Sequence, residues 1–398
     1  MIVKPLIRSN ICLNAHPVGC KKEVERQIFY VKQQAQKREP VKDAPKNVLV
    51  LGCSTGYGLA SRIAAAFGYG ATTIGVSFEK AGTETKSGTP GWYNNMAFDH
   101  AAEKEGLKYA TYNGDAFSDE MRQTIISKAK EMNIRFDLIV YSVASAVRVD
   151  PVTGEMYRSV LKPFGLSFVG QNIDVATNKL ITISAETANH EEAAQTVKVM
   201  GGEDWERWIK QLSDADVLAN GVKTIAYSYI GPSLSHAIYR DGTIGKAKEH
   251  LEKTADVLNE YLSSKVKGEA YVSVNKGLVT RSSAVIPVIP LYLSILFKKM
   301  KEKGTHEGCI EQAERLFAER LYTGGAVPVD ENRLIRIDDL ELDPEVQDYV
   351  SERMPLVTEE NLAQIGDLEG YKHDFLATNG FDVEGVDYNA EIERMDTI

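Results

Sequence analysis

The stretch NVLVLGCSTGYG, residues 47–58, decides the fold of this chain. It opens with a short apolar run, which is typical of a β-strand buried on both faces. Three glycines follow in the spacing Gly52-x3-Gly56-x-Gly58, and a helical pattern begins among them. Glycines at such a turn let the backbone approach a ligand closely, so that the N-terminus of the next helix can bind a pyrophosphate. The stretch therefore predicts a strand, a phosphate-binding turn and a helix.

Further apolar runs alternate with helical patterns along the chain. Strands are expected at residues 72–78, 108–114, 136–144, 223–231 and 269–275. Strands that alternate with helices of 10–15 residues indicate an α/β fold with a doubly wound, mostly parallel sheet of the Rossmann type. The glycine spacing resembles that of the short-chain dehydrogenases, so a fold like theirs is expected.

Two long interruptions break this alternation. Residues 80–95 are rich in Gly, Thr and Ser, and residues 146–222 form a large insertion with a probable hairpin. We expect these insertions to form a lid over the substrate. No linker separates an N-terminal extension (1–46) or a C-terminal helical region and tail (300–398) from the rest. The sequence therefore predicts one elaborated domain, residues 1–398.

Composition and sequence patterns disfavour several kinds of ligand and location for this protein. The formal net charge is −10, which disfavours a nucleic-acid backbone as a ligand. The N-terminus lacks the apolar run of a signal peptide. The most apolar segment, 282–297, contains two prolines and is too short to span a membrane, so it is expected to be a core helix or the wall of a substrate pocket. No metal-ligand spacing is present. We expect a cytoplasmic, metal-free monomer or weak homodimer without stable membrane insertion.

An acidic residue follows the second strand. Glu79 stands about 20 residues after the last glycine of the turn, where a carboxylate accepts hydrogen bonds from the adenosine ribose hydroxyls. It would repel a 2′-phosphate, which favours NADH over NADPH; a solvated acid at a strand end is the alternative. Asp115-Ala116 and Val143-Ala144 follow two more strands, at the edge of the sheet where cofactors bind.

Two tyrosine and lysine pairs compete for the catalytic role. Tyr261 and Lys265, in YLSSK, match the Tyr-x3-Lys spacing of short-chain dehydrogenases. The helix that carries them starts near Thr243, a plausible N-cap, and runs antiparallel to the strands. At 1.5 Å per residue Tyr261 lies about 27 Å from the cofactor end of this helix. Tyr239 and Lys248 lie at that end instead.

Tyr239 precedes this helix, and Lys248 lies in its second turn. A nearby ammonium and the positive end of the helix dipole would each stabilise a phenolate, so we expect Tyr239 to release a proton more easily than a free tyrosine. Lys246 is the obvious competitor of Lys248, and either could be a solvated surface lysine. Tyr229, at the end of the preceding strand, could address the same carbonyl group.

Long blocks spread over almost the whole chain resemble the NADH-dependent trans-2-enoyl-CoA reductases and the FabV-type enoyl-ACP reductases. The blocks are HPVGC, GCSTGYGLASRI, TIGVSFEKAGTETKSGTPGWYNN, GDAFSDE, VMGGEDW, AYSYIGP, YRDGTIGKAKEHL, SVNKGLVTRSSAVIP and NGFDVEGVDY. The Tyr-x8-Lys spacing of Tyr239 and Lys248 distinguishes this family from ordinary short-chain reductases. The resemblance therefore favours this pair.

The resemblance implies NADH as the cofactor and assigns the site residues. Tyr239 would be the proton donor, Tyr229 a substrate contact, and Lys248 would hold the ribose and tune Tyr239. One small departure is Val143, where relatives often have leucine. The implied NADH contacts are Gly52, Cys53, Ser54, Thr55, Gly56, Tyr57, Phe78, Glu79, Asp115, Ala116, Val143, Ala144, Lys248, Leu278, Val279 and Thr280.

The implied activity is reduction of the C2–C3 double bond of a trans-2-enoyl-CoA, such as crotonyl-CoA to butyryl-CoA, in fatty-acid or butyrate synthesis. An enoyl-ACP reductase of fatty-acid synthesis would use the same motifs with another carrier. A short-chain carbonyl reductase would depend on Tyr261 and Lys265, and a non-enzymatic NAD-sensing protein would show no turnover.

Overall fold

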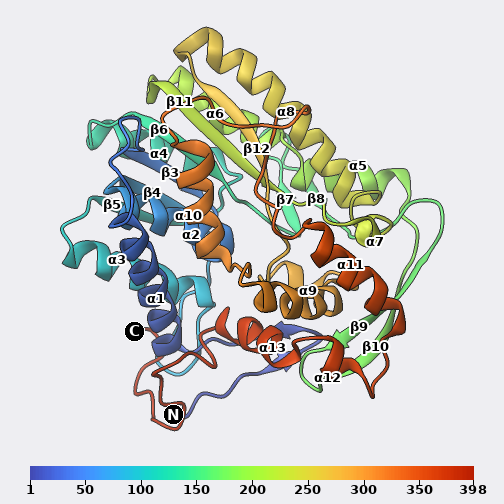
Figure 1. Ribbon diagram of the computed structural model, residues 1–398. Coiled ribbons are helices and arrows are strands. Elements are labelled where there is room, and N and C mark those ends of the chain that lie inside the picture. The colour runs from blue at the N-terminus through green and yellow to red at the C-terminus, as the bar shows by residue number, and fades with distance from the viewer.

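The computed structural model describes residues 1–398 and is organised around one parallel sheet (Figure 1). Its strand order is β13-β12-β11-β6-β3-β4-β5, so the direction of winding reverses between β3 and β6. A crevice for a ligand forms at such a reversal, beyond the carboxyl ends of the strands. The strands are β3 (Asn47–Leu51), β4 (Thr72–Ser77), β5 (Tyr109–Asn113), β6 (Phe136–Tyr141), β11 (Leu218–Ser228), β12 (Glu269–Val274) and β13 (Leu334–Arg336).

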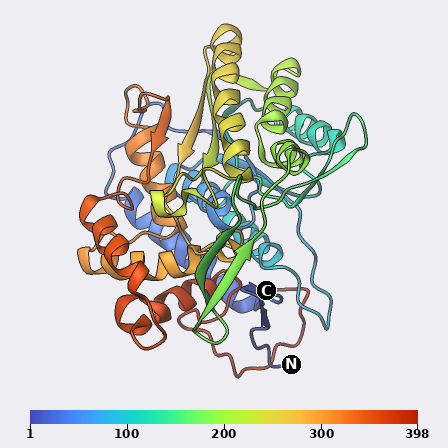
Figure 2. The ribbon, with the colours of Figure 1, turned by 90° about the vertical axis from the view of Figure 1, so that its right-hand side faces the viewer.

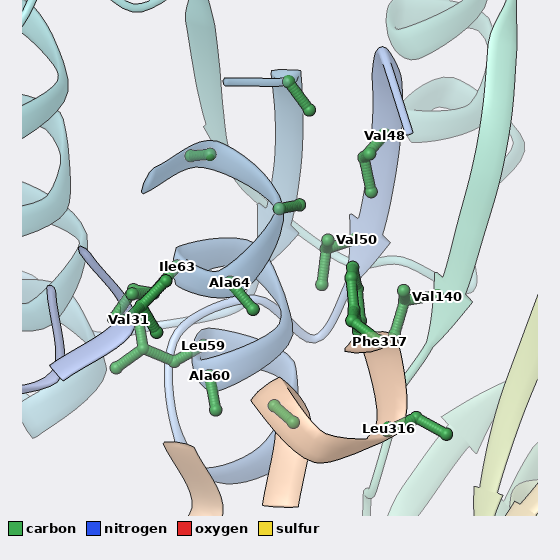
Figure 3. Packing of buried hydrophobic residues seen from close by; sticks show 14 of the residues in the cluster. Val31, Val48, Val50, Leu59, Ala60, Ile63, Ala64, Val140, Leu316 and Phe317 are labelled. Atoms are coloured by element: carbon green, nitrogen blue, oxygen red, sulfur yellow. The ribbon is translucent and has the colours of Figure 1, made fainter. Parts of the chain in front are cut away.

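Helices cover both faces of this sheet because side chains alternate along each buried strand. Val48 and Val50 of β3 face one layer, and Leu49 and Leu51 face the other. Figure 3 shows Val48 and Val50 with the residues that pack on their side. That layer contains α1 (Pro17–Ala35), α2 (Gly56–Ile63), α3 (Pro90–Lys104) and α10 (Cys309–Leu316), and the opposite layer contains α4 (Asp119–Glu131), α6 (Glu203–Asp214) and α8 (Thr243–Val266).

The doubly wound parallel sheet is confirmed, with two corrections to the predicted interruptions. The first interruption is shorter than expected, because α3 begins at Pro90. The second is not entirely an insertion: α6 buries Trp205 and Trp208 against the sheet, as an ordinary crossover helix does. Its last residues, 218–222, also belong to the sheet, because β11 begins at Leu218 and not at residue 223 as predicted. The other elements of the interruption are β7 (Val147–Val149), β8 (Met156–Arg158), β9 (Phe168–Asp174), β10 (Lys179–Ala185) and α5 (His190–Met200). Its role as a lid stays a prediction.

The C-terminal region was expected to be helical, but it also supplies a strand. β13 pairs in parallel with β12 and forms one edge of the sheet. The segment 282–297 forms mainly α9 (Ile289–Lys303), which is buried among α11 (Pro344–Arg353), α13 (Leu368–Ala377) and the β9–β10 hairpin (Figure 2). The expectation that this segment is a core helix is therefore confirmed for α9. Nowhere in the structure is a helix both long and apolar enough to cross a bilayer.

The remaining elements are short. They are the hairpin strands β1 (Ile7–Arg8) and β2 (Ile11–Cys12), the helices α7 (Ser233–His236) and α12 (Leu362–Ile365), π-helical turns at Ala64–Gly68 and Phe317–Leu321, and 3₁₀ turns at Ser283–Val285 and Met354–Leu356.

Candidate active site

The glycine turn after β3 has the geometry of a phosphate-binding loop. Gly52 has φ +86°, and a Cβ there would collide with the carbonyl oxygen of Ser142. A Cβ on Gly58 would collide in the same way with the carbonyl oxygen of Gly52. No side chain caps the N-terminus of α2, and its first turn carries no acidic residue. The first N–H groups of this helix are therefore available to an anionic ligand, and the loop fits a dinucleotide pyrophosphate.

Glu79 lies beside this turn. Ser54 Oγ donates a hydrogen bond to Glu79 Oε1 at 2.6 Å. The side chain of Asn113, at the end of β5, bonds both the N–H and the carbonyl oxygen of Glu79, at 2.7 and 2.8 Å. Phe78 is 79% exposed at the same rim. The carboxylate is thus held in place at the edge of the crevice, and the support from Ser54 and Asn113 had not been predicted from the sequence.

The other predicted cofactor residues also follow strands at the carboxyl edge. Asp115-Ala116 follow β5, and the carbonyl oxygen of Ala116 accepts a hydrogen bond from Trp208 Nε1 at 2.9 Å. Val143-Ala144 follow β6, and Leu278-Val279-Thr280 follow β12. The Thr280 methyl lies 3.6 Å from where a Cβ of Gly56 would be. The loops after β3 and β12 are therefore neighbours, as a shared cofactor site requires.

Tyr239 and Lys248 flank the start of α8. Gly242, not Thr243, is the N-cap of this helix. The Thr243 hydroxyl instead donates to the carbonyl oxygen of Val160 at 2.5 Å and ties the 146–222 segment to the helix. The N–H of Gly245 donates to the carbonyl oxygen of Tyr239 at 3.0 Å, which fixes Tyr239 to the first turn of α8.

The expected effect of Lys248 on Tyr239 is not found. Lys248 Nζ donates to the carbonyl oxygen of Tyr227 at 2.9 Å, and burial lowers the pKa of Lys248 to about 8. Burial also raises the pKa of Tyr239 above its usual value, and the charge of Arg240 opposes this only in part. The prediction of easier proton loss is wrong here, because desolvation of the Tyr239 hydroxyl outweighs the nearby positive charge. Lys246 is exposed and pairs with Glu249 at 3.0 Å.

The second tyrosine lies against the first. The rings of Tyr229 and Tyr239 meet edge to face, with their centroids 5.2 Å apart. Tyr229 Oη donates to Glu341 Oε1 at 3.0 Å. Glu341 lies 112 residues further along the chain, and no local pattern marked it as part of the site.

The competing pair lies elsewhere. Tyr261 and Lys265 occupy the last turns of α8, where the Tyr261 ring packs against the cluster that contains α6. Lys210 Nζ lies 6.0 Å from the centre of that ring. The structure therefore confirms that Tyr261 lies at the end of the helix opposite to Tyr239.

Three family models match the chain in succession. The NAD(P)H binding domain of trans-2-enoyl-CoA reductase matches residues 2–84. The trans-2-enoyl-CoA reductase catalytic region matches residues 86–322. A model described as an enoyl reductase FAD binding domain matches residues 329–392.

This last segment does not fit a flavin dinucleotide. Its helices α11 and α13 turn their buried side chains towards α9. The side chains of Asp343 and Asp367 cap the N-termini of these helices, where a pyrophosphate would need free N–H groups. Glu345 adds a further carboxylate to the first turn of α11. We assign no chemical step to a flavin.

Full-length relatives agree with the family models. Trans-2-enoyl-CoA reductase [NADH] of Treponema denticola is 66% identical over 100% of both chains. Its crystal structure in complex with NAD superposes with a TM-score of 0.97 over 100% of both chains. The enoyl-[acyl-carrier-protein] reductase [NADH] of Cytophaga hutchinsonii is 53% identical over 100% of this chain and 99% of its own length. The trans-2-enoyl-CoA reductase of Clostridium acetobutulicum, in complex with NADH, has a TM-score of 0.95 at 44% identity and covers 98% of each chain. Such identity along the full length, with a fold that superposes throughout, means that the chain belongs to the trans-2-enoyl-CoA reductase family.

Proposed function

We propose that the protein is an oxidoreductase that uses NADH to reduce the C2–C3 double bond of trans-2-enoyl thioesters, with coenzyme A as the principal carrier. The observation that carries this proposal is the placement of Tyr239 against Tyr229, which follows β11, with Lys248 bonded to the carbonyl oxygen of Tyr227 near the carboxyl end of the same strand. Its relatives are named for this reaction on CoA or acyl-carrier-protein substrates.

The residues named above would hold the cofactor. The free N–H groups of the α2 N-terminus would bind the pyrophosphate, Glu79 the adenosine ribose, and Lys248 the nicotinamide ribose. Asp115-Ala116, Val143-Ala144 and Leu278-Val279-Thr280 would line the rest of the crevice. When bound, NADH supplies the hydride that C3 of the enoyl group accepts.

Tyr239 would act on the thioester carbonyl. As C3 is reduced, negative charge collects on the carbonyl oxygen, and a donor aimed there is worth roughly 3 kcal/mol. The raised pKa of Tyr239 keeps its hydroxyl protonated at neutral pH, so the group enters the reaction as a hydrogen-bond donor. We assign it the proton that completes the reduction at C2.

The proposal is tested by following NADH oxidation with crotonyl-CoA and, separately, with crotonyl-ACP. Faster turnover of crotonyl-CoA supports the CoA reductase. Faster turnover of crotonyl-ACP would assign the protein to fatty-acid synthesis, and no turnover of either would refute the proposed activity.

The position of Glu79 predicts a preference for NADH. Ser54 holds its carboxylate in place, and the 2′-phosphate of NADPH would face it at a few ångströms, where an effective dielectric of about 20 gives a repulsion of about 4 kcal/mol per charge pair at 4 Å. We expect kcat/KM for NADH to exceed that for NADPH at least tenfold after screening. Glu79→Gln should narrow this ratio, whereas Glu84→Gln, which changes an exposed residue of the same loop, should leave it unchanged. Equal values for the wild type would contradict the assignment.

Binding of NADH should depend on pH. Lys248 is charged below its pKa of about 8 and neutral above it, so kcat/KM for NADH should fall as pH rises through that range. Lys276, whose pKa burial also lowers to about 8, titrates nearby. Comparing the pH profiles of the wild type and of Lys248→Met distinguishes the effects of the two lysines, because the variant retains only the pH dependence of kcat/KM that is due to Lys276. Identical profiles would exclude Lys248 as the titrating group.

Three further proposals concern the whole chain. We propose that residues 1–398 form one elaborated domain, since the seven-stranded sheet takes strands from β3 through to β13. We also propose that the protein is a monomer or weak homodimer and that it acts in the cytoplasm, as its composition suggests.

A further inference from the structure

Glu341 is the most deeply buried carboxylate near the candidate site. Its side chain is fully buried, and both of its carboxylate oxygens are hydrogen-bonded. Oε1 accepts from Tyr229 Oη at 3.0 Å and from Tyr292 Oη at 2.6 Å. Oε2 accepts from the N–H of Gly277 at 2.6 Å. One side chain therefore joins the end of β11, the loop after β12 and helix α9.

Such a group is costly to bury, and its surroundings offset only part of the cost: burial raises the pKa of Glu341, while the bonds from Tyr292 and Gly277 and the charge of Lys276 lower it. A buried charge is tolerated where every lone pair has a partner and an opposite charge lies near. Lys276, itself 2% exposed, supplies that charge, and its Nζ donates to the carbonyl oxygens of Gly277 and Glu307 at 3.2 and 3.3 Å. Gln347 holds the backbone of Glu341, since its Nε2 donates to the Glu341 carbonyl oxygen at 2.7 Å.

The hydrogen bonds of Glu341 to Tyr229 and to Gly277 have different consequences for the site. A tyrosine hydroxyl has one hydrogen, and the hydrogen of Tyr229 is given to Glu341. Tyr229 therefore cannot donate to a substrate carbonyl while this bond lasts, which leaves Tyr239 as the donor. Gly277 directly precedes Leu278-Val279-Thr280, the segment assigned to the cofactor.

We propose that Glu341 is a positioning residue, which fixes Tyr229 against Tyr239 and fixes the loop at Gly277 beside the cofactor. The inference rests on the proposed function and extends it to the segment 329–392. That segment then contributes to the reaction by supplying Glu341, which contacts the hydroxyl of Tyr229.

The test compares Glu341→Gln, Tyr229→Phe and the double variant, each measured for kcat on crotonyl-CoA and for the Kd of NADH. We expect Glu341→Gln to lower kcat roughly 10- to 100-fold, the cost of a small misplacement at a reacting centre. In the Tyr229→Phe background the same substitution should cost less than threefold, because its effect on kcat passes through Tyr229. Glu341→Ala, measured alongside, should raise the Kd of NADH in both backgrounds, because it removes the acceptor of the Gly277 N–H, which the single oxygen of glutamine could still supply.

Glu314→Gln is the matched control. Glu314 is a buried carboxylate on α10 that pairs with Arg38 at 2.8 Å, so this substitution should lower the Tm without lowering kcat. If Glu341→Gln does not fold, Gln347→Ala replaces it, with a smaller loss of kcat that should again shrink in the Tyr229→Phe background.

Losses of kcat that multiply in full would overturn the link to Tyr229, and an unchanged Kd of NADH in Glu341→Ala would overturn the link to Gly277. An inactive wild type would instead refute the proposed function, so the two failures are distinguishable.

Discussion

Tyr239→Phe should lower kcat on crotonyl-CoA by roughly 10²- to 10⁴-fold, the range for the loss of a positioned acid. The substitution removes only the hydroxyl, and the ring that packs against Tyr229 stays in place. The charge on the thioester carbonyl oxygen then loses its donor, and the proton for C2 loses its source. Binding of NADH should barely change, because the proposed cofactor contacts do not include the Tyr239 hydroxyl. Steady-state kinetics and a fluorescence titration with NADH measure the two effects.

Tyr261→Phe is the control for this prediction. Tyr261 belongs to the Tyr-x3-Lys pattern but lies at the far end of α8, so its loss should leave turnover near that of the wild type. The opposite outcome, activity lost with Tyr261 and kept without Tyr239, would point to a short-chain carbonyl reductase and refute the assignment of the site.

Lys248→Met should reduce both turnover and the affinity for NADH. The proposed role of Lys248 is to hold the nicotinamide ribose in place for hydride transfer, and methionine keeps the length of the side chain without the ammonium. We expect kcat to fall roughly 10- to 100-fold, with a rise of similar size in the Kd of NADH. Because Nζ is half-buried and bonded to the carbonyl oxygen of Tyr227, near the end of β11, a water molecule would replace it poorly.

The double variant Tyr239→Phe/Lys248→Met decides whether the two residues act together. Groups that act as a unit are not additive, so its loss of kcat should fall short of the product of the two single losses. Lys246→Met is the control, because Lys246 is exposed and pairs only with Glu249. Full multiplication of the losses would mean that Tyr239 and Lys248 work independently.

The sheet and the cofactor edge could be predicted because local patterns determine them. The apolar run of β3, the glycine turn and the strand-end residues are short-range features, and the structure places all of them as expected. β13 could not be predicted, since three residues carry no periodicity and their pairing depends on β12. Helix α6 could not be recognised as a crossover helix of the sheet, because the packing of Trp205 and Trp208 on the strands depends on the three-dimensional fold.

The electrostatics of the site depend on burial, which the sequence does not contain. Tyr239 was expected to be acidic from its neighbours in the chain, but desolvation raises its pKa. Glu341 and Lys276 could not be predicted as site residues for the same reason. Each is an ordinary charged residue in the sequence and becomes part of the site only because distant segments pack together and bury it.

The late position of Glu341 has a consequence for synthesis on the ribosome. Gly277 and Glu341 are 64 residues apart, so at 5–20 residues per second the carboxylate is made roughly 3 to 13 seconds after the loop that it holds. During that interval β3 to β12 can already pair, while Tyr229, Tyr292 and Lys276 lack the group that satisfies them. The nascent chain would therefore be able to assemble its nucleotide-binding half first, and it would become a competent catalyst only once Glu341 had left the exit tunnel.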